Sequence, residues 1–194
     1  DTNTIFRGNS LVSKCMDELM RLSGQHYLRA TLKPTLDLIV RERKPCEIDP
    51  TKMASGESRE NNLANLKEYV GYILKAISHS ALSCPPVMCQ IFSQLRELAN
   101  TYFPNQREVR YSVISGFVFL RFFAPAILGP KLFDLTTEII DTSTLRTLTL
   151  LSKTVQSVGN LVSLRSSQHN FKETYMRDMF SYCVTDKHVD AVRT

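Results

Sequence analysis

One charged residue interrupts the most apolar stretch of this 194-residue sequence. Arg121 lies inside the run Phe117–Ile127, whose other members are all apolar. An unpaired charge is very costly to bury, so this arginine must reach the edge of the core or pair with an acid. A snorkelling or salt-bridged arginine is the more common arrangement. The more specific interpretation is that its planar guanidinium holds the backbone carbonyls of a neighbouring loop and fixes the shape of that loop.

Two further cations lie in segments that could bring them to a surface. Lys153 is part of Leu151–Gln156, and by sequence alone it is an ordinary exposed helix lysine whose neighbours supply the buried stripe. Arg7 is part of Ile5–Ser10, a segment with a flexible glycine that precedes the first expected helix. Its composition alone describes an unremarkable surface arginine.

Motifs of the common enzyme classes are absent from the sequence. It has no GxSxG, P-loop, HExxH or Rossmann glycine pattern, and its histidines are isolated from one another, as surface histidines usually are. The formal net charge of +5 permits an acidic protein or lipid partner but does not indicate a nucleic acid.

The cysteines and the N-terminus favour an intracellular protein. The 5 cysteines form no CxxC pair, which argues against both a disulfide framework and a zinc site. Residues 1–10 do not resemble a signal peptide, and we expect no membrane span because Arg121 and Pro125 interrupt the longest apolar run. The first residue is not methionine, which suggests an excised piece of a longer protein.

The elements that must position these cations are predicted to be helices. Six helical segments and one loop carry the prediction. A first helix begins after Asn9 or Ser10 and loosens or ends at Gly24, with Val12, Met16, Leu19 and Met20, and Cys15 and Leu22 beside them, at helical spacing; a second, His26–Arg43, is kinked or divided by Pro34. After a loop at Lys44–Glu60, Leu63–Ile77 carries a strong apolar stripe, and a helix that starts at Pro85–Pro86 is expected to bury Val87, Ile91, Phe92, Leu95, Leu98 and Tyr102. Thr142–Leu164 is expected to bury Leu145 and Leu148 among others, and Phe171–Val184 is amphipathic.

One segment is ambiguous between a helix and a strand. Val109–Phe123 is rich in Val, Ile, Phe and Tyr, which suit a buried strand, but its length and its surroundings favour a buried helix that ends at Pro125. Together the segments predict an all-α fold, with the helices of a single domain over residues 1–194 packed around one core.

Three motifs, in order along the chain, resemble the catalytic domain of Ras GTPase-activating proteins (RasGAPs). Phe119–Leu128 is similar to the FLR…PA signature of that family, and Lys153–Gln156 is similar to its K-x-x-Q pattern. Ile5–Ser10 resembles the loop that carries the arginine finger of the family. The Lys44–Pro50 loop and the Asn61–Leu63 helix start are most similar to the GAP1 subfamily. The resemblance covers essentially the whole chain.

The resemblance implies a GTPase activator and assigns a role to each cation. Arg7, between Phe6 and Gly8, would enter the active site of Ras in trans, and Gly8 would let the finger loop approach closely. Arg121 would brace that loop, Leu120 would pack on a switch region of Ras, and Lys153, with Gln156 nearby, would pair with acidic groups there. The activator itself would need no cofactor, since GTP and Mg²⁺ belong to the GTPase.

Some expectations depart from the family pattern or stay open. The helices that precede the finger in the family are absent, so the domain is expected to be truncated on its N-terminal side, and Gly159–Asn160 only approximates a family asparagine. A non-catalytic scaffold that binds small GTPases is the alternative, although such members typically lack the finger arginine; a lipid-binding module is a second. The partner is expected to be a Ras-type GTPase, possibly Rap. We expect a cytoplasmic protein, recruited to the inner face of the plasma membrane through modules outside this chain.

Overall fold

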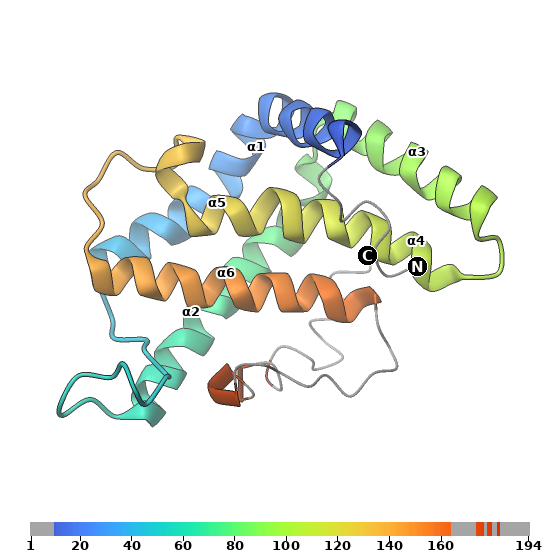
Figure 1. The fold of residues 1–194 in the computed structure, drawn as a ribbon. Helices are drawn as coiled ribbons and strands as arrows, with labels where there is room; N and C mark the ends of the chain where they lie inside the picture. The colour runs from blue at the N-terminus through green and yellow to red at the C-terminus, as the bar shows by residue number, and fades with distance from the viewer. Residues whose placement is uncertain (1–9, 164–173, 177, 180–181, 183–194) are drawn as a thin grey trace.

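Helices make up every regular element in the described part of the chain (Figure 1). The computed structural model describes residues 10–163, 174–176, 178, 179 and 182. In chain order the elements are α1 (Leu11–Glu42), α2 (Arg59–His79), the short 3-10 helix η2 (Ser80–Ser83), α3 (Pro86–Tyr102), α4 (Arg107–Ser115), the π-helix η3 (Gly116–Phe123), α5 (Ala124–Leu128), the 3-10 helix η4 (Pro130–Phe133), α6 (Thr142–Ser163) and η5 (Thr174–Met176). The predicted all-α class is confirmed. The predicted helix Phe171–Val184 lies mostly outside the described residues.

A continuous rod of α4, η3 and α5 lies at the centre and packs along α6 (Figure 1). The ambiguous segment Val109–Phe123 is therefore helical, because its aromatic residues fill the space between two helices. Pro125 does not end this rod as predicted. It is the second residue of α5, directly after the π-helix η3, and the helix continues to Leu128.

The rod also has the length and composition of a membrane-spanning helix. We expected no membrane span because the apolar run is interrupted, but Val109–Leu128 is long and apolar enough to cross a membrane. Half of this segment, however, is buried inside the protein. Core helices have the same character, and the contacts of this rod with α6 and α1 account for its apolar residues.

Helix α1 runs without a break through both residues that were predicted to interrupt it. Pro34 and Ala30, whose carbonyl loses its partner to the proline, are both exposed, so water can hydrate that carbonyl. Gly24 is buried where α1 comes close to other helices: a Cβ at this position would lie 2.7 Å from Phe122 Cζ and 2.8 Å from Met88 Sδ. The glycine therefore permits a close contact and does not end the helix.

Two predicted apolar faces are confirmed only in part. On α1, Val12, Leu19 and Leu22 are exposed, and the buried positions of this half are Ser13, Met20 and Gly24. On α3, the exposed set is Val87, Leu98 and Tyr102, and the buried set is Met88, Leu95 and Ala99. Met20 and Leu95 are buried as predicted, but small residues take other buried positions, Ser13 and Gly24 on α1 and Ala99 on α3. The apolar residues alone therefore identified each buried face only in part.

The packing of α6 on η3 depends on a second glycine. A Cβ on Gly159 would lie 2.6 Å from Phe119 Cβ, an atom fixed next to the backbone, and 3.6 Å from the carbonyl oxygen of Ser115. The carbonyl oxygen of Gly159 accepts a hydrogen bond from Ser115 Oγ at 2.9 Å. The two helices can approach this closely only because residue 159 has no side chain.

We expect Gly159→Ala to destabilise the fold by about 2 kcal/mol, because overpacking outweighs the better helix propensity of alanine. Gly71→Ala is the matched control inside α2, where the nearest atom to an added Cβ is 3.7 Å away. The control should be neutral or stabilising by up to about 1 kcal/mol. Urea unfolding of both variants provides the comparison, and equal stabilities would contradict the close packing of α6 on η3.

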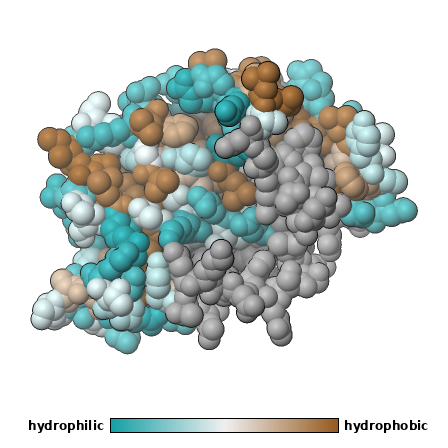
Figure 2. Space-filling view, viewed as in Figure 1, coloured by the Kyte–Doolittle hydropathy of each residue, from teal (hydrophilic) through white to brown (hydrophobic). Residues whose placement is uncertain are grey.

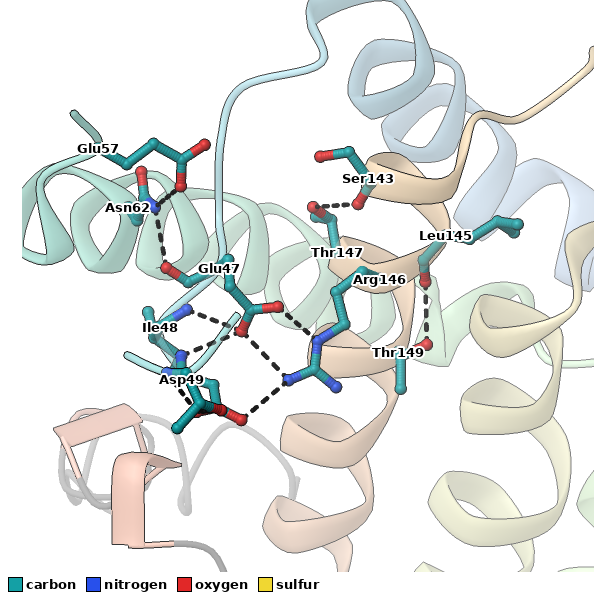
Figure 3. Close-up of polar contacts among 11 residues, drawn as sticks. Glu47, Ile48, Asp49, Glu57, Asn62, Ser143, Leu145, Arg146, Thr147 and Thr149 are labelled. Carbon is teal, nitrogen blue, oxygen red and sulfur yellow. Dashed lines mark hydrogen bonds and ion pairs between the residues drawn. The ribbon is translucent and has the colours of Figure 1, made fainter. Parts of the chain in front are cut away.

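A loop between α1 and α2 is fastened to α6 by an ion pair (Figure 3). Arg146 donates from Nε to Glu47 Oε2 at 2.7 Å and from Nη2 to Glu47 Oε1 at 3.1 Å. The backbone N–H groups of Ile48 and Asp49 donate to the same carboxylate, and Asn62 Nδ2 donates to the Glu47 carbonyl at 2.8 Å. The carboxylate therefore joins the loop to α6, and its carbonyl joins the loop to α2.

We expect Glu47→Gln to lower the free energy of unfolding by about 1–2 kcal/mol near neutral pH, because the pair loses its charge. Burial alone would raise the pKa of Glu47, but the hydrogen bonds from Arg146 and Asp49 outweigh it and the pKa is lowered. The stabilisation is thus complete above the ordinary glutamate pKa of about 4.5 and is lost as the pH falls through the lower folded-state pKa. The stability gap between wild type and variant should narrow below about pH 4.5, whereas exposed Glu97→Gln should open no gap. A gap that is constant with pH would contradict this assignment.

Candidate functional site

An open groove of about 380 Å³ lies between the first half of α1 and the rod of η3 and α5. Its lining comes from α1, from the rod and from η4: Lys14, Asp17, Glu18, Arg21, Leu120, Arg121, Phe122, Pro125 and Phe133. Two of the residues singled out in the sequence, Leu120 and Arg121, are adjacent in this lining. The groove is therefore the place where the FLR-like segment becomes accessible.

Arg121 is held in this groove by a carboxylate and an aromatic ring. Its Nη1 donates to Asp17 Oδ2 at 2.6 Å, and the side chains of Arg121 and Asp17 are 15% and 33% exposed. The guanidinium carbon lies 5.8 Å from the centroid of the Phe117 ring, which is close enough for a cation–π contact. The salt-bridged interpretation of Arg121 is therefore confirmed.

The finger segment itself is outside the described residues. Phe6, Arg7 and Gly8 precede Ser10, the residue that caps α1 by accepting a hydrogen bond from the Ser13 N–H at 3.1 Å. The roles of Phe6, Arg7 and Gly8, and the bracing of their loop by Arg121, stay predictions. What the structure does give is the start of α1 at Leu11, three residues beyond Gly8.

Beyond its first turn, helix α6 is buried except for one stripe. From Leu145 to Asn160 the accessible positions recur every three or four residues: Leu145, Thr149, Lys153, Gln156 and Asn160, with Arg146 and Ser157 beside them. Thr142 and Ser143 are exposed at the start of the helix. Leu145 is 44% exposed, so its predicted place in the core is wrong. Lys153 is half-buried and not the fully exposed lysine predicted, because neighbouring elements flank this stripe on both sides. Both residues of the K-x-x-Q pattern nevertheless lie on the accessible side.

Two hydrogen bonds place this stripe beside the FLR-like segment. Ser115 Oγ reaches the carbonyl of Gly159 at one end, and Ser152 Oγ reaches the carbonyl of Ala124 at the other, each at 2.9 Å. Leu120 lies midway between these contacts on η3, and Gln156 lies midway on α6. Since the helices run side by side, the two residues are at the same level (Figure 1).

The surface over these two helices has mixed character. Figure 2, in the same view as Figure 1, shows hydrophobic and hydrophilic residues side by side across the left half of this face, over α5 and α6. Such a surface suits a protein partner that presents both apolar and charged groups. We call the groove together with the accessible stripe of α6 the docking face.

Two buried or half-buried cysteines of the described residues are neutral thiols, and these residues form no metal cluster. Burial raises the pKa of Cys46 to about 12 and also raises the pKa of Cys84, so both thiols stay protonated at neutral pH. Within the same described ranges, no group of three or more His, Cys, Asp or Glu side chains converges as metal ligands would. What the docking face can contribute chemically is positive charge and shape.

Asp17 was missed by the sequence analysis, although a signal exists. The residues of α1 that face η3 and α3 recur at helical spacing as Ser13, Met20, Gly24 and Tyr27, and Asp17 falls in the same row. An acid in a buried row needs a cationic partner, just as Arg121 does in its apolar run. The ion pair between Asp17 and Arg121 could have been predicted if the buried face of α1 had been assigned correctly.

Comparison with known proteins identifies the family. The RasGAP family model, described as GTPase-activator protein for Ras-like GTPase, matches residues 1–61 and 55–160. A GTPase-activating protein of Drosophila melanogaster is 62% identical over 193 residues, which cover 100% of this chain and 17% of the relative. Ras GTPase-activating protein 3 of Rattus norvegicus is 52% identical and Ras GTPase-activating protein 2 of Homo sapiens 49%, each over 100% of this chain and 23% of the relative.

The chain thus spans about a fifth of the length of these relatives, at identities far above those that establish kinship. The match to the family model includes all three motifs, Ile5–Ser10, Phe119–Leu128 and Lys153–Gln156. The chain therefore belongs to the RasGAP family, as its motifs predicted, with relatives of the GAP1 subfamily.

Proposed function

We propose that this protein binds GTP-loaded Ras-type GTPases and accelerates their hydrolysis of GTP by inserting Arg7 into the partner's active site. Membership of the RasGAP family carries the proposal, and the position of the FLR-like segment beside the accessible stripe of α6 supports it. GTP and Mg²⁺ are held by the GTPase, so the activator supplies one catalytic side chain and a docking face. The activity takes place in the cytoplasm at the plasma membrane, with recruitment by modules outside this chain.

The chemistry explains why an arginine suffices. Phosphoryl transfer builds negative charge on the oxygens around the transferred group, and its catalysis consists mainly of positioning and electrostatic stabilisation. A guanidinium is permanently charged and its fork matches phosphate oxygens, which a lysine cannot do as well. Gly8, next to Arg7, lets the backbone approach the nucleotide closely. The attacking water is oriented by the GTPase, which removes the need for a general base in this chain.

The docking face supplies binding and support. Leu120 packs on a mobile switch region of the GTPase, and Gln156 lies beside it at the same level. Lys153 attracts acidic groups of the same switch region. Arg121, held from below by the Phe117 ring, keeps the finger loop in place.

The test is GTP hydrolysis by Ras and by Rap, each titrated with the protein, and binding to each GTPase measured in parallel. We expect a large acceleration with a Ras-type GTPase that saturates with the protein concentration. Binding without acceleration of either GTPase would instead establish the scaffold alternative. No binding to either would refute the partner class.

Reversal of one charge tests the docking face separately from the chemistry. We expect Lys153→Glu to weaken binding to GTP-loaded Ras about tenfold at low salt, and the deficit to narrow as salt screens the repulsion. The rate at saturating protein should change far less, because Lys153 does not reach the transferred phosphoryl group. The control is Lys75→Glu, which makes the same change in net charge at an exposed position of α2. Unchanged affinity of the Lys153 variant at low salt would move the contact surface away from α6.

A further inference from the structure

Asp17, the acid that pairs with Arg121, has a hydrogen-bond partner on only one of its two carboxylate oxygens among the described residues. Asp17 Oδ2 accepts the 2.6 Å hydrogen bond from Arg121, whereas Asp17 Oδ1 is buried with no donor among the described residues. A carboxylate kept in this state contributes less to stability than a fully satisfied one, because its second oxygen has lost water without replacement. Its charge is therefore of use chiefly to Arg121.

Asp17 is delivered to Arg121 by a rigid contact between helices. One row of α1 holds Asp17, Gly24 and Tyr27, and the ring of Tyr27 stacks on Phe122 with the centroids 6.0 Å apart and the planes at 13°. The close approach at Gly24 fixes the spacing between α1 and η3 in the same place. The Asp17 carboxylate is consequently presented from a fixed backbone, as a positioning group must be.

Asp17 is also connected directly to the segment that carries Arg7. It lies about two turns into α1, the helix that Ser10 caps, so the N–H groups at the start of α1 and the carboxylate of Asp17 belong to one rigid body. The other acid of α1 in the groove lining, Glu18, pairs with Arg21 at 2.6 Å on the exposed side and does not compete for this role.

We infer that Asp17 is a positioning residue for GTPase activation: through its ion pair with Arg121 it fixes the start of α1, and with it the base of the segment that carries Arg7. This inference rests on the proposed function. It differs from direct bracing of the loop by Arg121 alone, because it makes the carboxylate on α1 as necessary as the guanidinium on η3. The two side chains then act as one unit.

The experiment measures the hydrolysis rate at saturating protein, the half-saturating concentration and the melting temperature, with GTP-loaded Ras. We expect Asp17→Asn to lower the saturating rate by about ten- to a hundredfold, because a misplaced catalytic group loses its alignment. The half-saturating concentration should stay within a few fold, and Asp17→Glu should recover most of the rate. Asp37→Asn is the control on the same helix, since Asp37 pairs with Lys33 at 2.9 Å away from the groove.

A double-mutant cycle separates positioning from general destabilisation. In the Asp17→Asn background, Arg121→Lys should lower the saturating rate little further, since the ion pair is already broken. If the wild type accelerates hydrolysis and folded Asp17→Asn matches it, or if the two substitutions multiply independently, the role of Asp17 is refuted while the proposed function stands. If Asp17→Asn does not fold, Asp17→Glu decides: a folded protein with full rate supports the inference, and one with no recovery overturns it. A wild type without acceleration would overturn both.

Discussion

Arg7→Ala should abolish most of the acceleration of GTP hydrolysis while binding to GTP-loaded Ras stays within a few fold. The finger acts where charge develops in the transition state, so its removal lowers the rate at saturating protein and leaves ground-state binding nearly intact. The scale, about 10³- to 10⁵-fold, is that of the known arginine fingers of Ras activators and is taken from that system. Single-turnover hydrolysis at saturating protein measures it.

Arg7→Lys is the informative companion of that variant. Lysine keeps the positive charge but lacks the planar fork, so it should recover little of the lost rate. A rate for Arg7→Ala above about a tenth of the wild-type value would contradict the assignment of Arg7 as the finger.

Arg121→Ala should reduce both the stability of the fold and the rate. The change leaves Asp17 without its 2.6 Å partner and removes the side chain that covers the Phe117 ring. Loss of one member of a partly buried ion pair should cost about 2–3 kcal/mol, below the value for a fully buried pair because Asp17 is 33% exposed. The saturating rate should fall by about ten- to a hundredfold, since the finger is no longer held.

Thermal unfolding and hydrolysis by Arg121→Ala, Arg121→Lys and Arg21→Ala form the complete set. Arg121→Lys keeps the charge without the fork and should give intermediate values. Arg21 pairs with Glu18 where both side chains are about half exposed, so Arg21→Ala should leave the melting temperature close to that of the wild type. A normal melting temperature and a normal rate for Arg121→Ala would leave it a dispensable surface arginine.

Much of the fold could be predicted because the helices pack by their apolar periodicity. The stripe of α2, Leu66, Tyr69, Val70, Ile73, Leu74 and Ile77, is buried as predicted. The helix start at Pro86 and the loop after α1 were also predicted from proline and glycine positions. These signals are local, and local signals are visible in a single sequence.

The errors occurred where tertiary contacts outweigh local preference. Gly24 was predicted to break α1, but its missing side chain admits Phe122 and Met88. Pro34 was predicted to kink or divide the helix, but it faces solvent. The apolar side chains of Val87 and Leu98 suggested a buried face that α3 turns outward. Neither the partner of a helix nor the distance to it can be read from the helix alone.

The accessibility of three candidate site residues agrees with the motifs, whereas the geometry of the site could not be predicted and the roles of these residues stay predictions. Leu120, Lys153 and Gln156 were singled out from motifs, and the structure places all three on accessible positions of adjacent helices. The partner of Arg121 could not be predicted, because Asp17 is 104 residues away and its row on α1 was misassigned. An ion pair between residues this far apart in the sequence, such as Asp17 and Arg121, becomes visible only when the positions of the helices are known.

The most direct test of the central claim is the affinity of the protein for GDP-loaded Ras with and without aluminium fluoride, which mimics the phosphoryl group in transit. An activator is complementary to the transition state, so the wild-type protein should bind the fluoride complex at least about a hundredfold more tightly than the GDP form. Arg7→Ala should lose that preference. Equal affinity for the two forms in the wild-type protein would contradict a catalytic finger and leave a protein that only binds its GTPase.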